Sequence, residues 1–189
     1  MPLVRRTVGV ICVLLGLILG VTAVFAAAPK PTPITKDLRV LTRTRHSYDS
    51  LPKFADKLAA EAKTTRRVAT ALDSGKRAYF IYVVLTKDNR LCTVLVQQNG
   101  YKADCSPVPL AFDKTRRTTA VFNGLIGGVA ANDVKRVVLQ GGSKRKQVQL
   151  TADNGFIFGC PAPSTCASWV KTVLGYNTAG KLISTQTVG

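Results

Sequence analysis

"AYFIYVVLTKDNRLCTVLVQQNGYKADC", residues 78–105, contains the clearest secondary-structure signals in the sequence. Its first nine residues are rich in β-branched and aromatic side chains, and the Asp88–Asn89 pair that follows is typical of a turn. A second apolar run then leads into Asn99–Gly100, a dipeptide that strongly indicates a β-hairpin. The stretch therefore predicts antiparallel strands joined by tight turns.

The same alternation of apolar segments and turn residues continues to the C-terminus. Short apolar segments alternate with turn residues rich in Gly, Asn and Asp, and no helical pattern separates them. This spacing favours an antiparallel β-sandwich or small barrel over a parallel α/β sheet. We expect a chain that is mainly β (α+β), with about eight strands in a β domain over residues 78–189.

The segment before the β domain has a different pattern. Leu51, Phe54 and Leu58 recur at helical spacing, and Ser50 is a suitable N-cap for a helix that begins there. We therefore expect a helical stalk over residues 37–77.

The N-terminus carries an export signal. From Val8 to Ala28 the chain has 21 residues without a charge, enough for a helix to cross a hydrocarbon core of about 30 Å. Arg5 and Arg6 precede this run and favour a cytoplasmic N-terminus with the rest of the chain outside. We expect residues 1–28 to form a signal-anchor, or transmembrane, helix, and the Pro-rich residues 29–36 to form a linker.

Two fates of the N-terminal segment stay open. Small-residue sites ending at Ala26 or Ala28 would suit a cleaved signal peptide, but the apolar run exceeds the usual signal core of about 7–15 residues. We favour the retained anchor, which holds the C-terminal domain at the cell membrane outside the cytoplasm. Cleavage would instead release a secreted protein.

The formal charge of the chain is +17, and +15 without Arg5 and Arg6. A field of this sign attracts anionic lipid, an envelope polymer or an acidic protein. We expect no nucleic acid as partner, because the chain is exported and has no nucleic-acid-binding motif. The candidate surface for an anionic partner consists of Arg39, Arg43, Arg45, Arg66, Arg67, Lys114, Arg116, Arg117, Lys144, Arg145 and Lys146. The alternative is a basic surface that meets only solvent.

Four cysteines follow the apolar run: Cys92, Cys105, Cys160 and Cys166. An even number in an oxidising compartment is typical of disulfide bonds, and local geometry supports pairing between sequence neighbours. Zinc sites need tight Cys/His spacings that are absent here, so we expect no metal.

The first pair tests the register of the hairpin. A two-residue turn at Asn99–Gly100 would place Cys105 opposite Val94 and leave Cys92 at a diagonal position. A diagonal pair is too distant for an easy disulfide, so we expect a shifted turn or a β-bulge between the cysteines.

Enzymatic interpretations find little support. His46 is the sole candidate for a histidine base, and most of the nine aspartates stand at turn or cap positions. No phosphate-binding loop or dinucleotide fingerprint is present. We expect no catalytic residue and no cofactor.

Several segments in order resemble a family of exported or membrane-anchored actinobacterial proteins of uncharacterised function. They are "LPKFADKLA", "TTRRVATAL", "YFIYVVL", "LCTVLVQQNGYKADC", "GLIGGVAANDVKRVVLQGGSKRKQVQLTADNGFIF" and "GYNTAGKLI", spread over residues 50–183. The resemblance implies a β-rich exported domain with a hairpin disulfide, and no activity. "VAANDV", residues 129–134, replaces the family's Pro-Asp-Gly turn, and Cys160 and Cys166 are not part of the pattern.

Three functions follow in order of preference. The first is a non-catalytic binding or envelope-interaction module with a basic surface. The second is an extracytoplasmic sensor or an accessory subunit of a membrane complex. A hydrolase comes third.

Overall fold

The computed structural model describes residues 34–72, 76–113, 115–122, 125–159 and 169–188. The apolar run Val8–Ala28 lies outside these ranges, so the membrane helix stays a prediction. In the part of the chain that the structure describes, no helix has the length and hydrophobicity needed to cross a membrane.

Short helical turns, rather than a continuous stalk, precede the first strand. They are α1 (Ile34–Asp37), η1 (Arg39–Thr42), η2 (Ser47–Asp49), η3 (Lys53–Ala55) and α2 (Asp56–Glu61). The expected cap at Ser50 is wrong, because the residue at the N-cap of α2 is Ala55. The helical spacing of Leu51, Phe54 and Leu58 therefore ends in one short helix at Glu61.

The prediction of a helix over residues 62–72 is also wrong. These residues form β1 (Ala62–Leu72), which pairs antiparallel with β2 (Ala78–Thr86) along almost its entire length. The pairing satisfies the backbone of β1, and it buries Val68 and Ala69 at a register shift. The segment is also rich in threonine, which favours strands because it is β-branched. Its helical pattern is therefore weak, and pairing with β2 outweighs it.

Sheet A has the strand order β1-β2-β3-β4, with β3 spanning Arg90–Gln97 and β4 spanning Gly100–Pro107. Its central strands have the continuous apolar sequences noted above because both faces are buried. Ile81 and Leu95 point into the main core, whereas Val84 and Val94 join a second cluster that includes Leu58 of α2.

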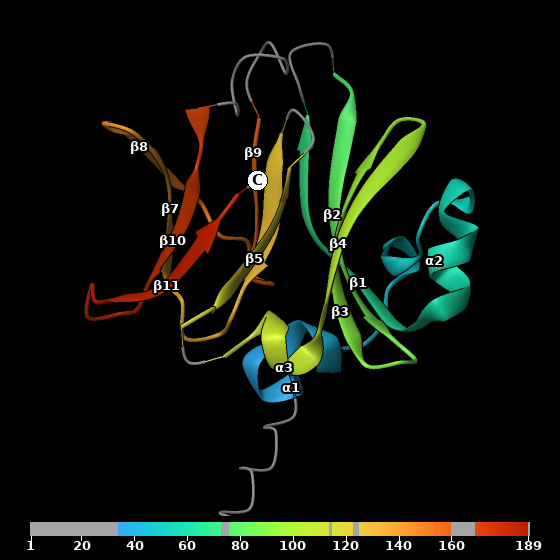
Figure 1. Ribbon diagram of the computed structural model, residues 1–189. Coiled ribbons are helices and arrows are strands. Elements are labelled where there is room, and N and C mark those ends of the chain that lie inside the picture. Colours follow the sequence, from blue (N-terminus) through green and yellow to red (C-terminus); the bar gives the residue numbers. More distant parts are fainter. Residues whose placement is uncertain (1–33, 73–75, 114, 123–124, 160–168, 189) are drawn as a thin grey trace, which may run out of the picture. The chain divides into compact units, whose positions relative to one another are not determined.

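Sheets B and C complete the fold (Figure 1). Sheet B consists of β5 (Thr118–Phe122), β6 (Ile126–Ala130) and β9 (Gly155–Phe158), in the order β5-β6-β9. Sheet C consists of β11 (Leu182–Thr187), β10 (Thr172–Tyr176), β7 (Arg136–Gly141) and β8 (Lys144–Val148), in that order. The short helix α3 (Val108–Ala111) connects β4 to β5.

The three sheets share one core. Sheet A contacts sheet B through β1 and β9 and through β3 and β5, and sheet B contacts sheet C through β5 and β11. The core includes Ile81 from sheet A, Val129 from sheet B and Leu139 from sheet C, all fully buried. The expected antiparallel β architecture is confirmed, but none of the described sheets closes into a barrel.

The hairpin of β3 and β4 confirms the expected shifted turn. Gln97 pairs with Gly100, so the turn falls on Gln98 and Asn99, one residue earlier than a turn at Asn99–Gly100. This register places Cys92 directly opposite Cys105, and the two form the predicted disulfide without a bulge between the strands. The other predicted pair, Cys160 with Cys166, lies outside the described residues.

Gly155 allows sheets A and B to pack closely. A Cβ atom at this position would lie 2.3 Å from the carbonyl oxygen of Val68 in β1. We expect Gly155→Ala to lower the free energy of unfolding by about 1–3 kcal/mol, because backbone atoms would have to move apart. Thermal unfolding would measure the loss, with Gly100→Ala as the control, since a Cβ atom at Gly100 meets nothing within 4 Å. Equal melting temperatures for the two variants would contradict this account.

Candidate functional site

The predicted basic residues do not form one surface. Arg117 forms ion pairs with Asp37 at 2.5 Å and with Asp133 at 3.1 Å. Burial lowers the pKa of Arg117, but the hydrogen bonds to Asp37 and Asp133 outweigh this effect and raise it. The guanidinium group is therefore already neutralised, and Arg117 adds little to a field that would attract an anion.

Arg43 forms a bidentate ion pair with the buried carboxylate of Asp49. Its two terminal nitrogens donate to Asp49 at 2.7 and 2.8 Å, and its Nε donates to Asp153 at 3.1 Å. Asp49 also accepts the backbone N–H groups of His46 and Arg67, each at 2.8 Å. Burial alone would raise the pKa of Asp49, but hydrogen bonds from Arg43 and from both backbone groups lower it to about 2.

Other predicted cations near Arg43 also have structural contacts. Arg66 donates to the carbonyl oxygens of Thr65 and Arg43, each at 2.8 Å. The guanidinium carbon of Arg67 lies 4.4 Å from the ring centre of Tyr48. These contacts fasten the segment around η2 to β1, and they give both arginines a role in packing.

The remaining predicted residues are spread over different parts of the fold. Arg45 donates to the hydroxyl of Ser50 at 2.8 Å, and Arg116 donates to the carbonyl oxygen of Leu110 at 3.3 Å. Lys114 lies outside the described residues, and Arg39 is described below with the pocket that it lines.

Sheet C has the largest excess of positive charge. Its four strands contain no acidic residue, whereas the strands and their flanks carry six exposed cations besides Lys135, which lines the pocket described below. We call this set the basic sheet surface; it consists of Arg136, Lys144, Arg145, Lys146, Lys171 and Lys181. Within the described ranges none of the six has a carboxylate partner. Three of the predicted residues, Lys144 to Lys146, are therefore brought together with three that the sequence analysis did not single out.

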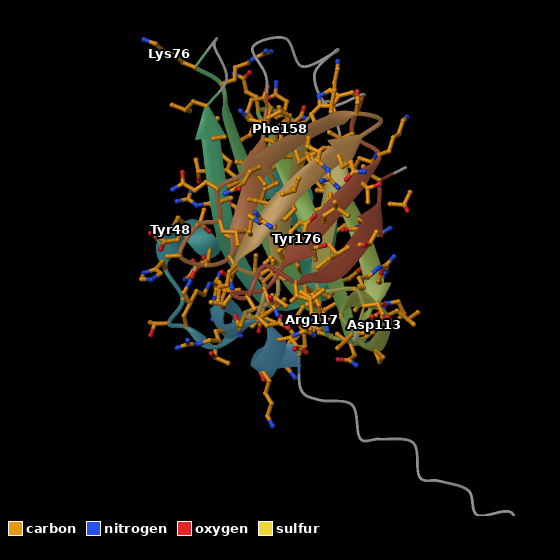
Figure 2. All side chains as sticks on the ribbon, turned by 90° about the vertical axis from the view of Figure 1, so that its left-hand side faces the viewer. Tyr48, Lys76, Asp113, Arg117, Phe158 and Tyr176 are labelled. Atoms are coloured by element: carbon orange, nitrogen blue, oxygen red, sulfur yellow. A yellow bond between two sulfur atoms is a disulfide. The ribbon has the colours of Figure 1, made fainter. Side chains whose placement is uncertain are left out.

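One face of sheet C combines two of these charges, Arg136 and Arg145, with an aromatic ring. Lys144 and Lys146 lie on the opposite face, because Lys146 pairs with the buried Leu139. Arg136 pairs across the strands with Tyr176, and its guanidinium carbon lies 4.4 Å from the ring centre. Arg145 donates to the side-chain oxygen of Gln140 at 2.9 Å. Tyr176 lies on the side of the protein that faces the viewer in Figure 2. The face thus offers cations, an aromatic ring and amide groups on a regular strand spacing.

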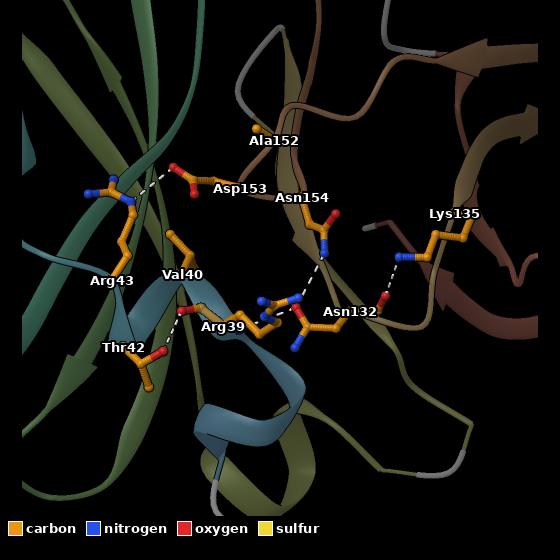
Figure 3. A pocket seen from close by; sticks show the side chains of 9 residues that line it. All are labelled: Arg39, Val40, Thr42, Arg43, Asn132, Lys135, Ala152, Asp153 and Asn154. Carbon is orange, nitrogen blue, oxygen red and sulfur yellow. Dashed lines mark hydrogen bonds and ion pairs between the residues drawn. The ribbon is translucent and has the colours of Figure 1, made fainter.

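A polar pocket lies beside the start of β7 (Figure 3). Its volume is about 500 Å³, and it is lined by Arg39, Val40, Thr42, Arg43, Asn132, Lys135, Ala152, Asp153 and Asn154. The guanidinium group of Arg39 has no partner among the described residues, and the ammonium group of Lys135 donates to the carbonyl oxygen of Asn132 at 2.7 Å. We call this cavity the polar pocket.

Asn132 holds the walls of the polar pocket together. Its side-chain oxygen accepts the backbone N–H of Arg39 at 3.2 Å, and its side-chain nitrogen donates to the carbonyl oxygen of Lys36 at 2.8 Å. The amide of Asn154 reaches the same oxygen at 3.4 Å. Residues separated by more than ninety positions are therefore fixed around one cavity.

The sequence carried one overlooked signal for the basic sheet surface. Between Val134 and Gly189 the chain has seven lysines or arginines and a single acidic residue, Asp153. No such signal existed for the polar pocket, because its residues come from separate segments of the chain. In the described ranges no group of three His, Cys, Asp or Glu side chains could hold a metal ion.

The fold and the charge distribution together define a small, mainly β domain with a basic sheet and an adjacent polar pocket. No family model, curated protein or solved structure matches this chain.

Proposed function

We propose that this protein is an exported, non-catalytic binding module that holds an extended anionic polymer of the cell envelope on its basic sheet surface. The observation that carries the proposal is the charge of sheet C, with six exposed cations in or beside its strands and no acidic residue within them. The apolar run Val8–Ala28 and the disulfide between Cys92 and Cys105 support a location in an oxidising compartment outside the cytoplasm.

The contrast with the other arginines explains why sheet C is the favoured surface. Arg43 and Arg117 each contact two carboxylates, so an approaching anion meets little net charge there. The cations of sheet C have no such partners, and their fields add together outside the protein within about one Debye length, ~8 Å at physiological salt.

The arrangement of sheet C favours an extended polymer over a single anion. Lys144 to Lys146 follow one strand, whereas Arg136 and Lys171 come from or flank neighbouring strands. Successive side chains of a strand point to opposite faces, so Arg145 lies on one face of the edge strand β8 and Lys144 and Lys146 lie on the other. The charges therefore line this edge of the sheet on both sides instead of forming one focal point. Tyr176 positions the guanidinium group of Arg136, which lies over its ring.

The proposal predicts a salt-dependent loss of binding in the triple variant Lys144→Ala, Arg145→Ala, Lys146→Ala. Each cation near a charged surface contributes about 1 kcal/mol, so we expect affinity for a soluble polyuronate to fall at least about tenfold at low salt. Isothermal titration calorimetry at several salt concentrations would measure the affinity and its salt slope.

The matched control removes the same charge from another part of the protein. Lys53→Ala, Lys57→Ala, Lys63→Ala changes three exposed lysines on η3, α2 and β1, and it should bind the polyuronate almost as the unchanged protein does. An equal loss in both triple variants, or an affinity independent of salt, would overturn the proposal. Binding only to vesicles that contain phosphatidylglycerol would replace the polymer with a lipid surface as the partner.

A further inference from the structure

The polar pocket contains groups of opposite charge on different walls. Arg39 and Lys135 supply two exposed cations. Asp153 supplies a carboxylate, of which one oxygen accepts from Arg43 while the other has no partner among the described residues. Figure 3 shows Asp153 beside Arg43 and Lys135 on the far side of Asn154. A ligand must therefore satisfy cations at one end and acceptors at the other.

The volume and preformed walls suit a small molecule. A cavity of about 500 Å³ lies within the range of about 300–1,000 Å³ that is usual for small-molecule sites. Asn132 already fixes the walls through its bonds to Arg39 and Lys36. Asn154 is held with φ of 57°, a left-handed conformation that few non-glycine residues adopt, while its carbonyl oxygen accepts the N–H of Ala130 at 2.9 Å. This backbone geometry aims the side chain of Asn154 along the pocket (Figure 3).

The charges also exclude simple ligands. Asp153 would repel a bare anion, and Arg39 with Lys135 would repel a cation. One oxygen of Asp153 accepts a hydrogen bond from Arg43, whose single charge is shared with Asp49, and the remaining oxygen is free to accept a hydroxyl of the ligand. Val40 and Ala152 add small apolar surfaces against which a ring could lie.

We propose that the polar pocket binds a single sugar acid, with its carboxylate between Arg39 and Lys135 and its ring hydroxyls on Asp153 and Asn154. Arginine and lysine donate charge-assisted hydrogen bonds to a carboxylate, and carboxylate and amide oxygens accept hydroxyl groups. This site uses none of the residues of the basic sheet surface. It goes beyond the proposed function and does not depend on it.

Isothermal titration calorimetry with glucuronate on the folded protein tests this proposal. We expect glucose, which lacks the carboxylate, and acetate, which lacks the ring hydroxyls, to bind at least about tenfold more weakly than glucuronate, because each loses a set of hydrogen bonds. Tighter binding of acetate, glutamate or glucose 6-phosphate than of glucuronate would overturn the assignment. So would the absence of glucuronate binding through the millimolar range.

Three variants locate the site within the fold. Arg39→Ala and Asn154→Gly should each weaken glucuronate binding at least about fivefold, and glycine at position 154 keeps the left-handed backbone while it removes the amide. Lys171→Ala removes an exposed cation outside the pocket and should leave glucuronate binding unchanged. Equal weakening by Lys171→Ala would assign the effect to the overall charge and overturn the pocket.

The two proposals fail separately. The triple variant of Lys144 to Lys146 should bind the polyuronate more weakly and bind glucuronate with unchanged affinity. Arg39→Ala should bind glucuronate more weakly and keep most of its affinity for the polymer. If the triple variant keeps the polymer, the proposed function fails. If Arg39→Ala keeps glucuronate, the pocket assignment fails.

Discussion

Replacing Asp49 by alanine is expected to lower the free energy of unfolding by about 3–5 kcal/mol, the cost of removing one partner from a buried ion pair. Asp49 is fully buried and accepts hydrogen bonds from Arg43 and from the backbone N–H groups of His46 and Arg67. Its loss would leave these donors without their acceptor and loosen the segment around η2 from β1. Denaturant unfolding of the purified variant would measure the loss.

Asp153→Ala is the matched control, because it removes the other carboxylate that contacts Arg43. The side chain of Asp153 is 31% exposed, and Arg43 would keep both of its bonds to Asp49. We expect a loss of at most about 1 kcal/mol, as for an exposed ion pair. If the two variants lose equal stability, the buried network does not hold this part of the fold.

The pH dependence of the free energy of unfolding provides a second test of the hydrogen-bond network around Asp49. The pKa of Asp49 is about 2 in the folded protein and 3.8 without its contacts, so its folded pKa is depressed. Its contribution to stability is therefore present above pH 3.8 and is lost as the pH falls toward 2, and it amounts to about 2 kcal/mol. Asp49→Ala should show a correspondingly shallower loss of stability over this range.

Removing the hairpin disulfide should have the second large effect. Cys92 and Cys105 are separated by 13 positions, and a crosslink that closes a loop of this size stabilises by about 3 kcal/mol in the chain-entropy model. We expect the double variant Cys92→Ala, Cys105→Ala to lose about this amount, with a lower melting temperature under non-reducing conditions. Cys92 is fully buried in the cluster that includes Leu58, so lost packing adds to the effect.

Val96→Ala offers a control for packing in the same cluster. Val96 is buried in the same cluster and on the same strand as Cys92, and its truncation removes apolar contacts without opening a crosslink. Reductant should therefore lower the melting temperature of Val96→Ala further and change that of the double cysteine variant much less. A double variant as stable as the unchanged protein would show that the crosslink does not constrain the unfolded chain.

The strands of sheet A were predictable because their surroundings leave a strong pattern in the sequence. Residues 78–86 and 91–97 have continuous apolar sequences, and both strands are buried on two faces. β1 shows no such pattern, because most of its side chains are only partly buried and residues 63–67 are all charged residues or threonines. The predicted helix over residues 62–72 is wrong because pairing with β2 outweighs the local helical preference of this segment.

The candidate site was less predictable than the fold. Arg43 and Arg117 resemble Lys144 in the sequence, since each stands in a small basic cluster. One partner of each arginine is distant in the chain: Asp153 lies 110 positions from Arg43, and Asp37 lies 80 positions from Arg117. The nearer partners, Asp49 and Asp133, lie 6 and 16 positions away, but no regular spacing marks them as partners. No local pattern distinguishes a paired arginine from a free one.

The antiparallel β character, the pairing of Cys92 with Cys105 and the need for a shifted turn or a β-bulge between them could be inferred from the sequence. These follow from local preferences and from the geometry of one hairpin, which depend on residues close together in the chain. Which cations stay free and which residues line the polar pocket became visible only in the folded protein. Burial and charge neutralisation depend on neighbours in space, and the fold brought these from segments that the sequence keeps apart.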